Sequence, residues 1–339
     1  MSRALALTIG EPAGIGPDLT LAIWRQRSQL SLPPFYVLGD AAFLARRANA
    51  LGLDVPLKAV APSEAAATFN FALPVVSIDR AITAEPGRPD ASSAPAAIEA
   101  IRRGVADVLS GAAAAIVTNP IAKSVLYQAG FEEPGHTEFL ATLVKEMTGK
   151  IVQPVMLLWS PELAVVPVTI HIALKDVFAK LTTDLVVRTG RIVARDYKTG
   201  FGVARPRLAI AGLNPHAGED GAMGSEDAAI LLPAVKQLQA EGIDARGPVP
   251  ADTMFHPAAR KQYDVALCAY HDQALIPVKT LAFDTAVNAT LGLPFVRTSP
   301  DHGTAFDIAG TGRADPSSLV AALKLAARLA ERTPASVLA

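Results

Sequence analysis

Residues 5–24 read LALTIGEPAGIGPDLTLAIW, and this stretch predicts the fold of the chain. It begins with an apolar, β-prone run, continues through a loop of glycine and proline, and ends in a helical pattern that reaches Trp24. The same order recurs at once, because residues 35–38 predict a strand and Asp40 can cap a helix that ends near Leu51. Strands that alternate with helices favour an α/β fold with mostly parallel pairing.

The alternation continues along the rest of the chain. Further strands are predicted at residues 114–118, 155–159, 165–170, 208–211 and 265–269. Helical patterns are predicted at residues 95–109, 137–147, 184–197, 226–240 and 317–330. Residues 84–94 are rich in proline, glycine and serine, which indicates a loop inside a domain and not a boundary between domains.

The composition argues against several classes of protein. With 31 basic and 32 acidic residues, the formal net charge is −1, so neither nucleic acid nor an anionic membrane is an expected partner. No apolar run approaches the roughly 20 residues of a membrane span, and the N-terminus lacks a signal-peptide pattern. The single cysteine, Cys268, excludes an intrachain disulfide. We therefore expect a cytoplasmic protein, and its 339 residues favour two lobes.

Three of the six histidines directly follow predicted strands: His171, His216 and His271. In open α/β sheets, ligands bind beyond the carboxyl ends of the strands. Neutral imidazole is the commonest ligand of zinc-like ions, and a catalytic metal site uses about three protein ligands. However, the wide spacing of these histidines matches no local motif such as HExxH, so the spacing alone leaves a metal site and three structural histidines both open.

A group of cationic and amide side chains indicates an anion site. Arg297 lies in the apolar run LGLPFVRTS, where a buried charge requires an anionic partner. That partner is either a structural carboxylate or a phosphate, which the guanidinium binds with paired donors. Upstream, His136 and Thr137 open a predicted helix after Gly135, and the free amides of a helix N-terminus bind anions. Thr137 also suits an ordinary N-cap.

Two glycine-rich loops remain. GEPAGIGPD, residues 10–18, matches neither the GxGxxG dinucleotide pattern nor the Walker loop. DHGTAFDIAGTGRADP, residues 301–316, has the small residues that let a backbone wrap closely around a planar ligand. Its Asp307 can accept hydrogen bonds from a ribose diol, which would favour NAD over NADP. The alternative is a surface turn.

Seven strings stand in the same order as in one known family: GEPAGIGPDL, TNPIAKS, GHTEFLA, GLNPHAGEDG, GPVPADTMF, YHDQALIPVKT and NATLGLPFVRTSPDHGTAFDIAG. On these motifs the chain resembles, nearly end to end, the 4-hydroxythreonine-4-phosphate dehydrogenases of vitamin B6 biosynthesis. Its second glycine loop is also similar to the cofactor loop of isocitrate and isopropylmalate dehydrogenases. The resemblance implies a two-lobed, isopropylmalate-dehydrogenase-like α/β fold with mostly parallel sheets, flanking helices and an active-site cleft between the lobes. We expect the first lobe at residues 1–125 and 285–339 and the second at residues 126–284.

The resemblance also implies site residues and cofactors. One divalent metal per subunit, Zn, Co or Mg, is expected at His171, His216 and His271, in a site that the subunits of a homodimer share. The substrate, chiefly its phosphate, is expected to bind His136, Thr137, Lys279, Asn288, Arg297 and Asp252. NAD, with NADP as the alternative, is expected at His302, Gly303, Asp307 and Gly310. Candidates for the proton acceptor are Asp272, Lys279 and a water molecule.

The activity implied is oxidation of 4-hydroxythreonine 4-phosphate to a β-keto amino acid, which loses CO2 to leave 3-amino-2-oxopropyl phosphate. The sequence departs slightly from the family pattern, with Ala274 and Ala286 at positions that commonly hold glycine and HIALKD in place of HLPLRD. The alternative substrate is 4-phospho-D-threonate or 4-phosphoerythronate. A cis-dihydrodiol lacks a phosphate, so the retained anion-binding residues argue against it. A metal- or phosphate-binding module without catalysis predicts damage to the cofactor loop or the histidines, and the sequence has neither.

Overall fold

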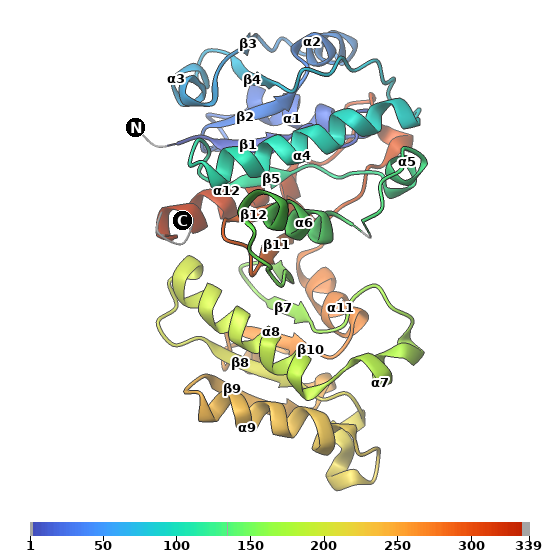
Figure 1. Cartoon of the computed structure of the whole chain (residues 1–339), viewed down its shortest axis with the longest axis vertical. Helices are drawn as coiled ribbons and strands as arrows, with labels where there is room; N and C mark the ends of the chain where they lie inside the picture. Colours follow the sequence, from blue (N-terminus) through green and yellow to red (C-terminus); the bar gives the residue numbers. More distant parts are fainter. Residues whose placement is uncertain (1–2, 134, 334–339) are drawn as a thin grey trace. The chain divides into compact units, whose positions relative to one another are not determined.

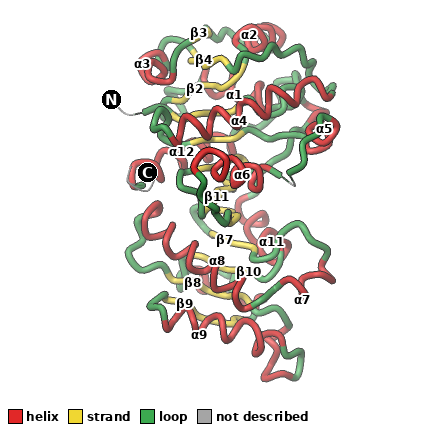
Figure 2. The backbone as a smooth tube through the Cα atoms, in the orientation of Figure 1, coloured by secondary structure: helices red, strands yellow, loops and turns green. Residues whose placement is uncertain are grey.

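The structure is a computed structural model that describes residues 3–133 and 135–333, and these residues fall into two compact units (Figure 1). Unit 1 comprises Met1–Pro154 and Leu293–Ala339, and unit 2 comprises Val155–Gly292. Each unit contains one sheet whose strands lie among helices, as the yellow and red segments of Figure 2 show. The predicted α/β class with mostly parallel pairing is confirmed.

The sheet of unit 1 is entirely parallel, with the order β3-β4-β2-β1-β5-β12. Its strands are β1 (Leu5–Thr8), β2 (Phe35–Gly39), β3 (Leu57–Ala59), β4 (Leu73–Ser77), β5 (Ile116–Thr118) and β12 (Arg297–Pro300). Its helices are α1 (Gly16–Arg25), α2 (Ala41–Ala50), α3 (Ala65–Thr68), α4 (Ala94–Leu109), α5 (Lys123–Gln128), α6 (His136–Thr148) and α12 (Ser317–Arg332). The predicted cap of α2 is present, since the Asp40 carboxylate accepts a hydrogen bond from Ala42 N at 2.8 Å.

Helix α4 crosses in front of this sheet in Figure 1 and packs directly on its strands. The close approach depends on Gly104, because a Cβ atom at that position would lie 2.5 Å from Cδ1 of Ile116 in β5. The helix also buries alanines and branched residues against the strands, which gives unit 1 a tightly packed apolar core.

The sheet of unit 2 has the order β11-β6-β7-β10-β8-β9. Its strands are β6 (Val155–Trp159), β7 (Ala164–Pro167), β8 (Arg207–Ala211), β9 (Asp244–Val249), β10 (Val265–Cys268) and β11 (Val287–Leu291). Strand β6 pairs antiparallel with β11 and with β7, whereas β7, β10, β8 and β9 pair in parallel. The helices are α7 (Val177–Lys180), α8 (Thr183–Asp196), α9 (Leu232–Ala240), α10 (Pro257–Arg260) and α11 (His271–Ala282).

Several elements differ from the sequence prediction. The helix predicted at residues 226–240 consists of a π-helical turn, Asp227–Leu231, followed by α9, whose second residue is Pro233. Proline has no backbone N–H, so a regular α-helical ladder cannot continue through this position. Strand β7 ends at Pro167 instead of residue 170, and α11 follows β10 without having been predicted. Among the described residues, no helix is both long and apolar enough to cross a membrane.

The boundaries between the units also differ from those expected at residues 125/126 and 284/285. Helix α6 belongs to unit 1 because it packs on α4, and the two helices are linked by an ion pair of 2.8 Å between Arg102 and Glu146. Strand β11 belongs to unit 2 because it pairs with β6. His136 and Thr137 therefore lie in unit 1, and Asn288 lies in unit 2.

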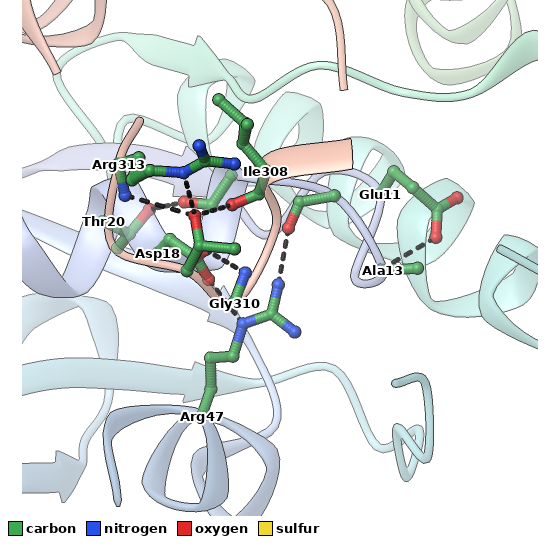
Figure 3. A network of polar contacts seen from close by, with 11 residues as sticks. Glu11, Ala13, Asp18, Thr20, Arg47, Ile308, Gly310 and Arg313 are labelled. Atoms are coloured by element: carbon green, nitrogen blue, oxygen red, sulfur yellow. Dashed lines mark hydrogen bonds and ion pairs between the residues drawn. The ribbon is translucent and has the colours of Figure 1, made fainter. Parts of the chain in front are cut away.

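A buried ion pair between Asp18 and Arg47 holds the first glycine-rich loop in place (Figure 3). Both residues are nearly inaccessible to solvent, at 4% and 3% exposed. Arg47 Nη2 also donates to the carbonyl of Gly14 at 2.7 Å, and the second carboxylate oxygen of Asp18 accepts from Gly310 N at 2.6 Å. One carboxylate thus joins α1, α2 and the loop after β12.

We predict that Asp18→Asn lowers the free energy of unfolding by about 3–5 kcal/mol, because it leaves the guanidinium of Arg47 buried without a counter-charge. The matched control is Asp184→Asn, which removes one partner of the exposed 2.9 Å pair with Arg188 and should cost less than about 1 kcal/mol. Urea unfolding followed by circular dichroism measures both values. A loss below 1 kcal/mol for Asp18→Asn would contradict this account of the pair.

Candidate active site

The three histidines of the predicted metal site lie at the same edge of the sheet in unit 2. His171 follows β7, His216 follows β8 and His271 begins α11 after β10. Strand β10 lies between β7 and β8, and all three are parallel, so their carboxyl ends point the same way. The fold therefore gathers three imidazoles that are far apart in the sequence onto three neighbouring strand ends.

Two of these imidazoles are close neighbours. The ring centroids of His171 and His271 are 5.7 Å apart, and the ring planes are inclined by 43°. The Nδ1 atom of His271 is 2.7 Å from the Asp272 carboxylate, which leaves Nε2 to face a ligand. A carboxylate partner of this kind commonly orients a metal-binding histidine. Within residues 3–133 and 135–333, no set of three or more His, Cys, Asp or Glu side chains is arranged to hold a metal, so the described chain does not assemble the expected three-histidine ligand set.

The backbone of both outer histidine loops is unusual. His171 has φ = 51° and His216 has φ = 53°, and both values fall in the left-handed region that favours glycine. Three more non-glycine residues close to His216, namely Ala217, Glu219 and Asp220, share this conformation. Such residues typically cost of order 1–3 kcal/mol each, and they cluster at functional sites where the surrounding structure enforces them.

A buried carboxylate that the sequence analysis missed enforces the His216 loop. Asp227 is 1% exposed and accepts hydrogen bonds from Leu213 N at 2.8 Å and from Asn214 N at 3.1 Å. It also accepts one from the side-chain amide of Asn214 at 2.9 Å. The only signal in the sequence is an acidic residue before the apolar run AAILL, which a helix prediction treats as an exposed position.

Two further side chains tie the strand ends to one another. Gln273 is buried, accepts a hydrogen bond from Ala269 N at 2.6 Å and donates one to the carbonyl of Gly212 at 2.7 Å. It thereby joins the end of β10 to the end of β8. Thr169 donates from its hydroxyl to the carbonyl of Ala269 at 2.7 Å, which attaches the chain ahead of His171 to the same point. Hydrogen bonds thus connect the segments that lead into all three histidine loops.

The other candidates of unit 2 lie on α11, in a turn that contacts the His216 segment and in β11. Helix α11 carries Asp272 in its first turn and Lys279 in its last, with the Lys279 ammonium 5.6 Å from the ring centroid of Phe283. Asp252 is exposed and belongs to a short turn, Ala251–Thr253, that contacts the His216 segment. Asn288 lies in β11, in register with Leu158 of β6.

Unit 1 holds the basic group. Arg297 begins β12, is 3% exposed and donates to the hydroxyl of Thr118 from Nε at 3.1 Å and from Nη2 at 2.6 Å. Burial lowers the pKa of Arg297 to about 10, so it remains charged at neutral pH. The predicted burial of this arginine in an apolar run is observed.

His136 lies at the start of α6, beside this arginine. Burial, together with the positive charges of Arg297 and Lys123, holds the pKa of His136 well below its ordinary range, so the ring is neutral at pH 7. The residue is partly exposed as a whole, but its Nε2 atom is inaccessible and has no hydrogen-bond partner among the described residues. The N-cap of α6 is Gly135 and not Thr137, and no side chain caps the helix. The first-turn amides are therefore left for a ligand.

The predicted cofactor residues lie together in unit 1, in the loop that follows β12. His302 and Gly303 come first, and Asp307 is exposed in a short turn, Phe306–Ile308, just ahead of Gly310. This loop packs against the first glycine-rich loop, since Ile15 N donates to the carbonyl of Thr304 at 3.0 Å. Gly14 is required there, because a Cβ atom would lie 2.8 Å from that same carbonyl oxygen. The two glycine loops thus form one surface at the carboxyl ends of β1 and β12.

Comparisons with known proteins agree with the motifs. The family described as "Pyridoxal phosphate biosynthetic protein PdxA" matches residues 31–326. A 4-hydroxythreonine-4-phosphate dehydrogenase from Bradyrhizobium diazoefficiens is 64% identical over 337 residues, which cover 97% of each chain. The crystal structure of a 4-hydroxythreonine-4-phosphate dehydrogenase from Klebsiella pneumoniae gives a TM-score of 0.85 at 37% identity, and the match covers 97% of this chain and 100% of that one.

A more distant solved structure is a terephthalate 1,2-cis-dihydrodiol dehydrogenase from Burkholderia xenovorans, with a TM-score of 0.65 at 27% identity over 97% of this chain and 98% of that one. All of these relatives are dehydrogenases, so the oxidoreductase class expected from the sequence is confirmed. The matched family and the nearly full-length identity agree with the motif order and with the paired glycine loops, and the chain belongs to the PdxA family of pyridoxal phosphate biosynthetic proteins.

Proposed function

We propose that this chain oxidises 4-hydroxythreonine 4-phosphate with NAD, as a step of pyridoxine 5′-phosphate biosynthesis. The secondary alcohol loses a hydride to the nicotinamide and a proton to a base, and the product is 2-amino-3-oxo-4-phosphooxybutanoate. This β-keto acid then releases CO2 to leave 3-amino-2-oxopropyl phosphate. The observation that carries the proposal is the 64% identity over 97% of the chain to a dehydrogenase named for this substrate.

The basic group of unit 1 supports a phosphorylated substrate. Arg297 offers a buried guanidinium at the start of β12, close to the first turn of α6, and a guanidinium binds phosphate with paired donors. The open amides of α6 and the neutral imidazole of His136 add donors without adding a further charge. A cis-dihydrodiol has no group that would use these donors, so they favour a phosphate ester over the substrate class of the more distant relative.

The histidines of unit 2 support a divalent metal. His171 and His271 offer imidazoles at a suitable separation, His216 would be the third ligand, and Zn, Co or Mg is the proposed ion. When bound, such an ion stabilises negative charge that develops on the substrate hydroxyl as the proton leaves. Asp272 and Lys279 on α11 are the proposed proton acceptors, with water as a third. Asp252 and Asn288 complete the proposed substrate contacts in this unit.

The loop after β12 is the proposed NAD site, with NADP as the alternative. His302, Gly303 and Gly310 would line the cofactor, and Asp307 would accept hydrogen bonds from a ribose diol. Its carboxylate is exposed, so it is accessible to such a ligand. A carboxylate in this role repels a 2′-phosphate, which favours NAD.

The choice between two phosphorylated substrates is tested by turnover. We expect kcat/KM for 4-hydroxythreonine 4-phosphate to exceed that for 4-phospho-D-threonate by at least about tenfold, a difference of roughly 1.4 kcal/mol in transition-state binding. Both substrates carry the phosphate, so this comparison isolates recognition of the amine. Faster oxidation of the phosphothreonate would assign the chain to that reaction instead.

The metal assignment is tested with His216→Ala. We expect metal-dependent turnover to fall below detection and the Zn2+ stoichiometry, measured by elemental analysis after dialysis, to fall below one per chain. NAD affinity should stay within twofold because the cofactor loop lies in unit 1. The matched control is His256→Ala, since His256 is exposed, directly precedes α10 and follows none of the three strands. Full activity and full zinc content in His216→Ala would remove this histidine from the site.

We also propose that the protein is a cytoplasmic homodimer, and apolar side chains near the histidine pair support the dimer. Leu174 and Phe178 are 63% and 52% exposed, and Ile276 and Phe283 on α11 are 65% and 70% exposed. The contact between His171 and His271 links the two segments that carry these side chains. Large apolar residues that gather on a surface commonly mark an interface.

We therefore expect sedimentation equilibrium at micromolar concentration to give twice the chain mass of 35.3 kDa, and Phe178→Glu to shift the protein towards monomer. Phe71→Glu is the control, because Phe71 is also exposed, at 79%, but lies in unit 1. A wild-type chain that sediments as a monomer would contradict the proposed dimer.

A further inference from the structure

The motif TNPIAKS, residues 118–124, contains one charged side chain that the proposed function has not used. Thr118 accepts the hydrogen bonds of Arg297. The side-chain amide of Asn119 donates to the carbonyl of Thr8 at 2.9 Å and to the hydroxyl of Thr20 at 3.1 Å. Lys123, the first residue of α5, takes part in neither of these networks.

The ammonium of Lys123 lies over the first turn of α6. A Cβ atom on Gly135, the N-cap of α6, would lie 3.2 Å from Lys123 Nζ and 3.3 Å from Cε. The amino end of a helix carries partial positive charge, so a cation is unfavourable at this position unless an anion joins it. The absence of a side chain at Gly135 leaves room for the ammonium to approach.

The neighbours of this ammonium increase the positive potential. Lys123 and Arg297 are both close enough to His136 to lower its pKa, so the two charges act on one small region. A carboxylate is also present, since one oxygen of Glu138 lies 3.2 Å from the same Cβ position on Gly135. Within residues 3–133 and 135–333, however, the ammonium of Lys123 has no ion-pair or hydrogen-bond partner.

The buried Nε2 atom of His136 is a second and independent sign of a ligand at this helix end. A ring nitrogen that is shielded from water and left without a partner is costly unless a bound group satisfies it. Two cations, a helix N-terminus and this nitrogen together provide charge and donors for an anion with several oxygens. A phosphate monoester carries close to two negative charges at pH 7 and three terminal oxygens.

We propose that Lys123 binds the phosphate of the substrate together with Arg297 and the first turn of α6, and that it selects doubly charged phosphate esters over singly charged anions. This inference rests on the proposed function, because it adds a residue to the phosphate site of unit 1. One cation matches a singly charged group, whereas the second charge of a phosphate monoester calls for another. Lys123 is exposed, so its flexible stem can follow the ligand without loss of packing.

The test uses the full-length chain with the substitution Lys123→Met. We expect its dissociation constant for inorganic phosphate, measured by calorimetry, to rise about tenfold, and KM for 4-hydroxythreonine 4-phosphate to rise by a similar factor while kcat changes less than twofold. Lys123→Arg should retain most of the affinity because it retains the charge. Lys145→Met is the matched control, since Lys145 is exposed in the last turn of α6, at the opposite end of that helix from the proposed phosphate site. It should leave both values unchanged.

A second readout does not depend on turnover. The charge of Lys123 lowers the pKa of His136, so the imidazole resonance of His136 should titrate at higher pH in Lys123→Met and at an unchanged pH in Lys145→Met. A merely structural role for Lys123 would not predict this selective shift. An unchanged titration in Lys123→Met would show that the ammonium is too far from the ring to share a ligand with it.

Arg297→Lys separates failure of this inference from failure of the proposed function. If Lys123→Met binds phosphate within twofold of wild type while Arg297→Lys binds it much more weakly, the phosphate site stands and Lys123 is not part of it. If wild type does not bind phosphate and Arg297→Lys leaves KM unchanged, the phosphate site itself is misassigned. If Lys123→Met lowers the thermal midpoint, Lys123→Arg decides: near-normal phosphate affinity supports the role of the charge, and a tenfold loss contradicts it.

Discussion

Parallel pairing of neighbouring strands is the constraint on which the candidate residues of each unit depend. In unit 2, β7, β10 and β8 run side by side in the same direction, so the chain turns after each of them at one edge of the sheet. In unit 1, β1, β5 and β12 do the same for the two glycine loops and for the residues around Thr118. Backbone hydrogen bonding alone therefore collects functional residues that are far apart in the sequence. The side chains then need only local support, which Asp227 and Gln273 give to the histidine loops.

Two arginines of unit 1, Arg47 and Arg297, are equally buried but make different contacts. Arg47 is paired with the carboxylate of Asp18, so its charge is neutralised inside the fold. Arg297 is equally inaccessible but donates to the neutral hydroxyl of Thr118. In low-dielectric surroundings an unpaired charge costs more free energy than in water, and its attraction for an anion is also larger. The two guanidinium groups are alike in burial, and Arg297 is the one that we propose for the phosphate.

Sequence patterns predicted the parts of the fold that depend on local chemistry. The cap at Asp40, the start of α6 after Gly135 and the burial of Arg297 all follow from residue type and neighbours. Strands β11 and β12 were not predicted because VNATL and RTSP are too polar or too short to show a strand pattern, and only their pairing partners make them strands. Likewise, the assignment of α6 to unit 1 follows from its packing on α4, a contact between segments that no local pattern encodes.

The candidate site divides in the same way. The positions of the three histidines after strands could be predicted from the sequence, because apolar runs indicate where strands end. Their left-handed backbone could not be predicted, because only glycine indicates that conformation in a sequence. His171 and His216 adopt it because the surrounding contacts enforce it. With a net charge of −1, the chain has no general attraction for anions, so recognition of a phosphate must arise where cations are held together locally. Burial lowers the pKa of both Arg297 and His136. Arg297 nevertheless stays charged at neutral pH and His136 stays neutral, so the start of α6 has both a positive charge and a neutral imidazole beside it.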